Sequence, residues 1–205
     1  MADPRHATLW AALVTAFAGL LRKSEFSLPD GVVFDPSRHL TREDVMFYPN
    51  AAGTQWESAD LHVRFSKTEQ TSTDYAIPIA WTGGPVCAVS ALLHMCHIVP
   101  AGPRTPLFQL DGGQALSSAC VVRLLRSLVQ ATPALANVRM TMHSLRIGGT
   151  VALQEAGASE VAIQLAGRWR SDSWKAYVRF SRRFVLGWSR RMVDPTAPLP
   201  SLRQL

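Results

Sequence analysis

The spacing of apolar residues changes twice along this chain, and these changes constrain its fold more than any other feature. Helical spacing comes first and predicts a buried helix that runs to about Leu21. Proline and glycine then interrupt the pattern, and three strand-like runs follow at residues 45–48, 61–66 and 75–80. The polar stretch 67–74 predicts a hairpin turn between the last two. Because helical spacing returns from Pro85 onward, the expected fold is α+β and mainly helical, with a small three-stranded antiparallel sheet.

Capping residues predict where the later helices begin and end. Gly157 is expected to end a helix that begins near His143, Ser159 to cap the next helix, and Gly167 to end it. A final helix is expected over residues 172–192. The amphipathic run 117–130 should be a helix that turns four apolar side chains inward, namely Val121, Leu124, Leu125 and Leu128.

Length and composition indicate one domain. With 205 residues, 47% of them hydrophobic, the chain is long enough for one buried core, which we expect over residues 1–193. Residues 194–205 form a Pro-rich C-terminal tail with little core potential. The apolar segment 7–21 is too short to cross a bilayer, so no membrane partner is expected.

Cysteine usage favours a reducing, intracellular setting, because the three cysteines form no CxxC pair and are an odd number. His94, Cys96 and His97 lie close together in sequence, but the apolar run 86–99 around them favours core packing over a metal site.

Positive charge is concentrated in the last third of the chain. Residues 139–205 hold 11 Lys or Arg against 4 acidic residues, whereas residues 1–138 hold 10 against 11. Such a field favours a polyanion, most simply nucleic acid, although a solvated basic face would have the same composition.

Two separated segments carry residues suited to phosphate chemistry. His143 and Arg146 are three positions apart, so on a helix they project from the same face and place a proton carrier beside a permanent cation. Downstream, residues 167–172 read Gly-Arg-Trp-Arg-Ser-Asp, and Tyr177 follows nine positions after Arg168. Taken alone, each feature has an ordinary structural explanation: a surface pair for the first, and an interfacial aromatic for Tyr177.

This order resembles the C-terminal signature of the tyrosine recombinases, the phage-integrase type family: H-x-x-R, a Gly before a His or Trp position, and then a Tyr. The Gly-Arg-Trp sequence at residues 167–169 most resembles the branch found in eukaryotic crypton-like mobile elements. Upstream segments agree, because Arg22 after a Gly-Leu helix end, with Glu25 three positions on, is similar to the family's first motif. Lys67 stands at a turn between two strands, where the family has its catalytic lysine.

The resemblance implies a catalytic role for each motif residue. Two guanidiniums, from Arg22 and Arg146, can hold the non-bridging phosphate oxygens. Lys67 can protonate the leaving 5′ oxygen, and His143 can either handle the proton of the attacking phenol or donate a hydrogen bond to the phosphate. Tyr177 is the expected nucleophile, which forms a 3′-phosphotyrosine without a metal or cofactor.

Further residues are expected to support this set. Glu25 should hold the Arg22 side chain in position. Arg168 takes the catalytic position that is His or Trp in most relatives, and it cannot relay a proton because it stays charged. The indole N–H of the neighbouring Trp169 offers a substitute. Four cations are expected to contact DNA: Lys23, Arg170, Lys175 and Arg179.

Three functions follow, in order of expectation. The first is site-specific recombination or integration of double-stranded DNA for a mobile element. The second is a domesticated DNA-binding module with impaired catalysis, and the third is a topoisomerase-like relaxing activity. The resemblance also implies a homotetramer on DNA and a monomer without it, located in the nucleus of a eukaryote or the cytoplasm or nucleoid of another cell. The family's N-terminal core-binding domain has no counterpart in this sequence, and weak DNA affinity is expected for the chain alone.

Overall fold

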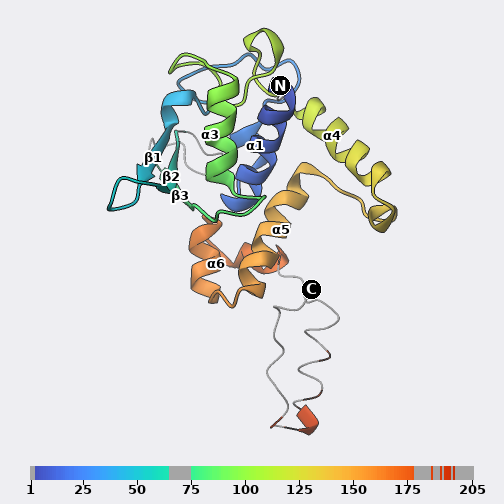
Figure 1. Cartoon of the computed structure of the whole chain (residues 1–205). Helices are drawn as coiled ribbons and strands as arrows, with labels where there is room; N and C mark the ends of the chain where they lie inside the picture. Colours follow the sequence, from blue (N-terminus) through green and yellow to red (C-terminus); the bar gives the residue numbers. More distant parts are fainter. Residues whose placement is uncertain are drawn as a thin grey trace. The chain divides into compact units, whose positions relative to one another are not determined.

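The computed structural model describes residues 3–64 and 75–177, together with 186, 190, 192–194 and 196 (Figure 1). Contacts divide the chain into two compact units, residues 1–146 and 147–205. In the described ranges the chain forms six α-helices, four short 3₁₀ helices and one three-stranded sheet. No helix in these ranges is both long and apolar enough to cross a membrane.

Helix α1 (Pro4–Ala18) begins at a capping residue and is buried from Ala7 to Ala16 except at Trp10. The carboxylate of Asp3 accepts the backbone N–H of Arg5, and Pro4 occupies the first helical position, where its missing N–H is harmless. The helix ends three residues before the predicted Leu21. Leu20 takes a left-handed backbone with φ 47°, which stops the helix, and the N–H of Leu21 then reaches back to the carbonyl of Ala16.

The sheet has the order β1-β2-β3, with both pairs antiparallel. Its strands are β1 (Val45–Pro49), β2 (Trp56–Val63) and β3 (Tyr75–Ala80). The prediction for β3 is confirmed, but the prediction of 61–66 for β2 is wrong at both ends. Ser58 and Trp56 pair with Tyr48 and Pro49, so the strand begins well before the run of alternating apolar residues. The predicted hairpin at 67–74 and Lys67 lie outside the described residues.

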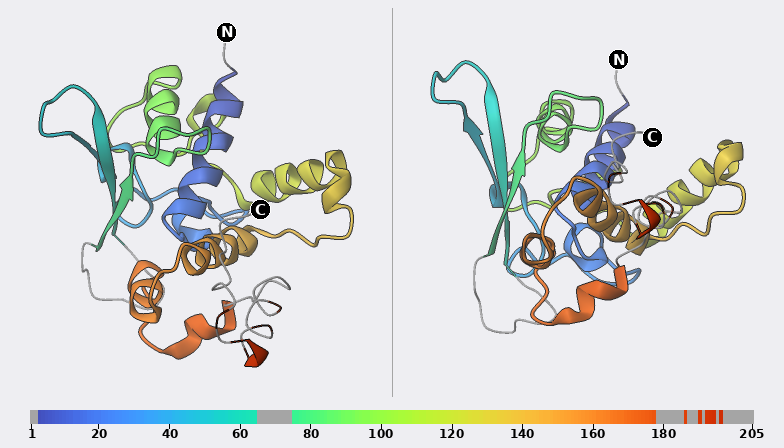
Figure 2. Two further views of the ribbon diagram at one scale, coloured as in Figure 1. Left: turned by 60° about the horizontal axis from the view of Figure 1, so that its bottom comes forward. Right: turned by 90° about the horizontal axis from the view of Figure 1, so that it is seen from below.

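Helix α3 (Ala88–Ile98) lies between this sheet and α1, as the views of Figures 1 and 2 agree. The inward residues of β2 are Ala59, Leu61 and Val63, and they pack with α1 and α3 in one apolar core. His94 and His97 are exposed on α3, so core packing is the wrong prediction for them, whereas Cys96 is partly buried against the core. All three cysteines are free.

Helix α4 (Ser118–Ala131) follows the N-cap Ser117, whose hydroxyl accepts the N–H of Cys120. Val121 and Leu125 are buried as predicted, and Leu124 packs against the core. Leu128 is 43% exposed, so its predicted inward position is wrong.

The second unit contains most of helix α5 (Met142–Glu155) and all of α6 (Glu160–Ala166). The predicted caps are confirmed: Gly157 has a left-handed φ of 84°, Ser159 accepts the N–H of Ala162, and Gly167 ends α6. Where a final helix was expected over residues 172–192, the structure describes the 3₁₀ helix η4 (Asp172–Tyr177) and the helical residues Leu186, Arg190 and Met192. The remaining short elements are α2 (Lys23–Phe26) and the 3₁₀ helices η1 (Arg42–Asp44), η2 (Asp111–Gly113) and η3 (Pro133–Leu135).

Candidate functional site

Arg22 and Glu25 form the first half of the candidate site, in the turn that follows α1. Arg22 is the N-cap residue of α2, and Glu25 lies three positions later. One carboxylate oxygen of Glu25 accepts the backbone N–H of Arg22 at 2.8 Å, and the other accepts its guanidinium Nη1 at 2.9 Å. The Glu25 side chain is 2% exposed and that of Arg22 23% exposed. The expected contact is therefore present: a buried carboxylate fixes the Arg22 stem and leaves its guanidinium within reach of solvent.

Arg146 belongs to the first turns of α5 and is nearly buried, with 3% exposure. Its guanidinium Nη1 donates a hydrogen bond to the backbone carbonyl of Leu20, 126 positions earlier in the chain. Leu20 is the residue with the left-handed backbone after α1, and Arg22 follows it by two positions. The Arg146 side chain therefore reaches the same turn of the first unit that carries Arg22.

A second contact holds the same two segments together. The hydroxyl of Ser27, just after α2, lies 3.5 Å from the sulfur of Met142 at the start of α5. It also donates to the carbonyl of Lys23 at 2.9 Å, which closes α2. At the start of α5 the hydroxyl of Ser144 accepts the N–H of Thr141 at 2.9 Å. The contact of Ser27 with Met142 joins the start of α5 to the turn that carries Arg22 and the exposed Lys23.

His143 is exposed on α5, one turn before Arg146. Desolvation lowers the pKa of His143 below its ordinary value, and the positive charge of Arg146 lowers it further. The imidazole is therefore mainly neutral at pH 7, the form that can accept a proton. Arg22, His143 and Arg146 together offer two guanidiniums and a neutral base.

The other predicted site residues fall in the second unit, in the turn after α6 and in η4. Arg168 has a left-handed backbone with φ 57°, and its N–H bonds to the carbonyl of Leu165. The ring of Trp169 lies directly on Gly167: a Cβ on that glycine would stand 1.6 Å from a ring carbon. Gly167 is thus required for this packing, a constraint that the motif alone does not state. Tyr177 is the last residue of η4.

The remaining predicted DNA contacts differ in their surroundings. Arg170 is exposed in the loop before η4. The Lys175 ammonium lies 2.7 Å from the carboxylate of Asp172, and this bond raises the pKa of Lys175. Arg179, like Lys67, lies outside the described residues. Within the described ranges no three His, Cys, Asp or Glu side chains are grouped as a metal ion would require.

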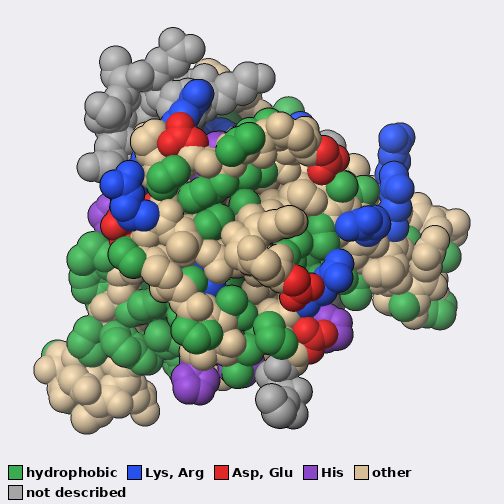
Figure 3. Space-filling view, turned by 90° about the horizontal axis from the view of Figure 1, so that it is seen from above, with side chains coloured by type: hydrophobic (Ala, Val, Ile, Leu, Met, Phe, Trp, Pro, Cys, Tyr) green, Lys and Arg blue, Asp and Glu red, His purple; other side chains and the backbone are tan. Residues whose placement is uncertain are grey.

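Charge on the end of the first unit at which α1 begins is mixed in sign. Figure 3 looks onto this end, and several of the Lys and Arg side chains on its described part lie beside Asp or Glu side chains. This agrees with the balanced charge of residues 1–138. It leaves the basic excess to the segment that includes Arg168 and Arg170.

No family model and no curated protein matches the sequence. Solved structures do resemble the fold. One is the XerH site-specific recombinase bound to its difH substrate in a pre-cleavage complex, with a TM-score of 0.58 and 14% identity over 95% of this chain and 49% of that one. Another is the Tn1549 transposon integrase in complex with circular intermediate DNA, with a TM-score of 0.51 and 15% identity over 91% of this chain and 57% of that one.

This chain thus spans about half the length of the solved recombinases that it matches. The likeness shows the fold, which is that of a tyrosine recombinase catalytic domain, and the expected α+β class with its small antiparallel sheet is confirmed.

Proposed function

We propose that this protein cleaves and rejoins DNA through a 3′-phosphotyrosine intermediate, in site-specific recombination or integration of a mobile element. The observation that supports the proposal most is the hydrogen bond from Arg146, one turn after His143 on α5, to the carbonyl of Leu20, two positions before Arg22. The second unit supplies Tyr177 at the motif spacing. The fold shared with DNA-bound recombinases adds to this support. The Gly-Arg-Trp wording at residues 167–169 favours the crypton-type branch.

The proposed reaction exchanges one phosphodiester bond for another. The phenolic oxygen of Tyr177 attacks phosphorus, a bond to the tyrosine forms, and the bond to the 5′ oxygen breaks. His143 accepts the phenolic proton, and Lys67 gives a proton to the departing 5′ oxygen. Arg22 and Arg146 stabilise the charge that builds on the non-bridging oxygens. A 5′ hydroxyl from another strand reverses these steps, so the bond energy is conserved.

The proposal also specifies a substrate, an oligomeric state and a cellular location. Double-stranded DNA is the proposed partner, and its phosphates are assigned to the exposed Lys23, Arg170 and Lys175 and to Arg179. A homotetramer on DNA and a monomer without it are part of the proposal, as is a location in the compartment that holds DNA.

A nicked duplex tests the proposal, because the short strand beyond the cleaved bond diffuses away and traps the covalent intermediate. We expect protein that stays attached to DNA in denaturing gels when a broad pool of sequences or the element's own ends are offered. Tyr177→Phe should abolish the adduct. Tyr48→Phe, which changes an exposed tyrosine of β1, is the matched control and should leave it intact. Absence of any adduct, or an equal amount from Tyr177→Phe, contradicts the proposal.

Arg168 favours a second candidate, a DNA-binding module that has lost catalysis. A guanidinium cannot relay a proton, and here it stands in a strained turn after α6. This candidate predicts salt-sensitive duplex binding that Tyr177→Phe leaves unchanged, together with no covalent product. A topoisomerase-like activity would instead relax a supercoiled plasmid without recombinant products.

A further inference from the structure

A cavity lies in the first unit at the end of α1 that Figure 1 marks N, where α3 ends and the loop around η2 passes. Its volume is about 340 Å³. At about 30 Å³ for each water molecule, roughly ten waters would fill it. Ligand pockets in proteins have volumes of about 300–1,000 Å³, so the cavity is large enough for a small organic molecule. The motif residues Arg22, His143 and Arg146 do not line it.

The side-chain amide of Gln109 is the strongest sign that this cavity receives a ligand. Gln109 lines the cavity and is only 7% exposed. Its backbone pairs with Ala115, but its side chain makes no hydrogen bond to any described residue. The amide atoms are not closed off from solvent, so they face the open space of the cavity. Because a buried amide without a partner is costly, a ligand that hydrogen-bonds to it would remove that penalty.

Two charges of opposite sign line the same cavity from different elements. Arg5 comes from the first turn of α1 and Asp111 from η2, and both are exposed. The guanidinium of Arg5 has the sulfur of Cys120 as a weak acceptor at 3.7 Å. The carboxylate of Asp111 has no partner among the described residues, and no ion pair joins it to Arg5. Both charges therefore remain available to a ligand.

The end of α3 adds an apolar wall. Ile98 and Val99 line the cavity there, and Leu110 lines it from the neighbouring loop. The last carbonyl groups of an α-helix carry a partial negative charge, which favours a cation at this end of α3. The cavity thus offers a guanidinium to an anion, a carboxylate and a helix end to a cation, and an apolar surface to a hydrocarbon group.

We propose that this cavity binds a small zwitterion with an apolar side chain, of the α-amino acid class. Arg5 pairs with the ligand carboxylate, Asp111 with its ammonium group, and the amide of Gln109 completes its hydrogen bonds. The apolar side chain packs on Ile98 and Val99. A simple carboxylic acid or amine would leave one of the two protein charges unpaired, and a phosphate would be repelled by Asp111. The proposal is independent of the recombination chemistry proposed above.

L-leucine and two molecules that each lack one of its charges test the proposal. 4-Methylpentanoate keeps the carboxylate and lacks the ammonium group, and 3-methylbutylamine keeps the ammonium group and lacks the carboxylate. Each is titrated into the whole chain, and amide NMR shifts of Gly112 and Gly113, which line the cavity, give the dissociation constants. We expect L-leucine to bind at least about tenfold more tightly than either, because each shortened molecule loses one charge-assisted contact.

Two substitutions match the two shortened molecules. Arg5→Met should weaken binding of L-leucine and of 4-methylpentanoate by about tenfold and leave 3-methylbutylamine unchanged. Asp111→Asn should weaken L-leucine and 3-methylbutylamine and leave 4-methylpentanoate unchanged. Both side chains are exposed, so both variants should fold. Arg104→Met and Glu57→Gln change exposed residues outside the cavity and should match the wild type.

Gln109→Met separates ligand binding from a structural role, because it removes the amide at nearly constant size. We expect weaker L-leucine binding with no loss of stability to urea in the ligand-free protein, since the amide has no partner there. Loss of stability in this variant would show that the amide serves the fold, against the proposal. Absence of saturable shifts with L-leucine in the tens of millimolar, or equal affinity for all three molecules, also overturns it.

Discussion

Leu20 and Arg168 are the described residues other than glycine that have a positive φ, at 47° and 57°. A left-handed backbone costs a residue with a Cβ roughly 1–2 kcal/mol, and such strain persists only where surrounding contacts hold it. Leu20 is buried, and its carbonyl accepts the guanidinium of Arg146. The strained turn thus aims a backbone acceptor at a motif arginine. Arg168 lies in the other motif segment, so both strained positions adjoin the proposed chemistry.

The lowered pKa of His143 can be tested by varying the pH. We expect its imidazole to titrate below its ordinary midpoint of 6.5, because desolvation and the charge of Arg146 both disfavour the protonated form. Adduct formation should accordingly be undiminished at pH 7 and fall as the pH drops through this lowered pKa. An NMR titration of the ring protons measures the midpoint, and Arg146→Met should move it upward. A wild-type midpoint at or above 6.5 contradicts the electrostatic account.

Gly167 provides a packing test. A Cβ at this position would overlap the ring of Trp169, so Gly167→Ala must displace that side chain. We expect a loss of about 1–3 kcal/mol in the free energy of unfolding and a changed indole N–H resonance for Trp169. Gly84→Ala is the control, since nothing lies within 4 Å of its added Cβ. Equal effects of the two substitutions would mean that Trp169 does not pack on Gly167.

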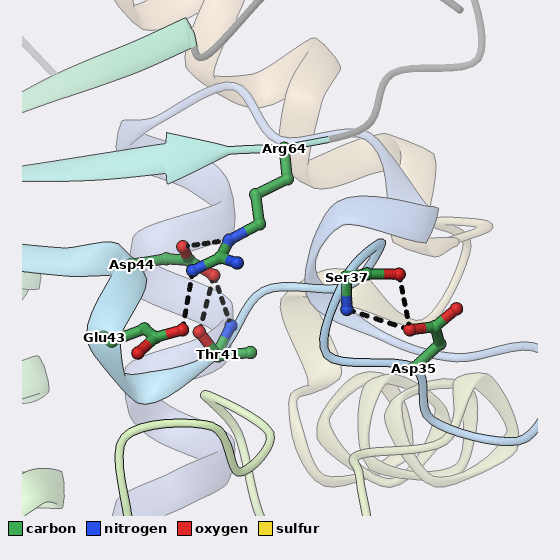
Figure 4. A network of polar contacts seen from close by, with 6 residues as sticks. All are labelled: Asp35, Ser37, Thr41, Glu43, Asp44 and Arg64. Atoms are coloured by element: carbon green, nitrogen blue, oxygen red, sulfur yellow. Dashed lines mark hydrogen bonds and ion pairs between the residues drawn. The ribbon is translucent and has the colours of Figure 1, made fainter. Parts of the chain in front are cut away.

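The sequence predicts the chemistry of single residues better than their partners. Three site residues can be recognised in the sequence because their side-chain types and spacing suit phosphate chemistry, namely Arg22, His143 and Arg146. The acceptor of the Arg146 hydrogen bond has no such signature in the sequence, because every residue carries a backbone carbonyl. Only the fold brings the carbonyl of Leu20 within reach of Arg146. The ion pairs of Arg64 with Asp44 and Glu43 (Figure 4) have no sequence signature for the same reason, because these carboxylates precede it by 20 and 21 positions.

The ends of helices were predictable where a capping residue fixes them. Ser159 and Gly167 bound α6 as expected, because their capping bonds involve only neighbouring residues. The start of β2 at Trp56 depends instead on pairing with β1, which apolar alternation does not reveal. The left-handed turn at Leu20 ended α1 early, although its apolar spacing continues to that residue. Non-local pairing and local strain therefore account for these errors.

Helix α4 tests how far apolar periodicity describes burial. Leu125 is 1% exposed and Leu128 is 43% exposed, although both lie on the predicted apolar face. We expect Leu125→Ala to lower the free energy of unfolding by about 2–5 kcal/mol through loss of burial and the cavity that remains. Leu128→Ala should change it by less than about 0.5 kcal/mol. Urea denaturation measures both, and similar losses would place Leu128 in the core after all.

At the scale of the whole molecule, the proposed reaction divides its parts between the two units. Arg22, His143 and Arg146 belong to the first, and Arg168 and Tyr177 to the second. The proposed chemistry requires both sets to act on one phosphate. The basic excess of the chain lies in residues 139–205, which contain the proposed nucleophile together with His143, Arg146 and Arg168.

Mass spectrometry of the trapped adduct tests this central claim most directly. After digestion of protein and DNA, trypsin should release a peptide of residues 176–179 that carries a 3′-linked nucleotide on Tyr177. Arg22→Ala and Arg146→Ala should each lower the yield of this peptide by about 100-fold or more, since each removes a donor to the phosphate. A nucleotide on any other residue, or undiminished yield from both arginine variants, would contradict the account.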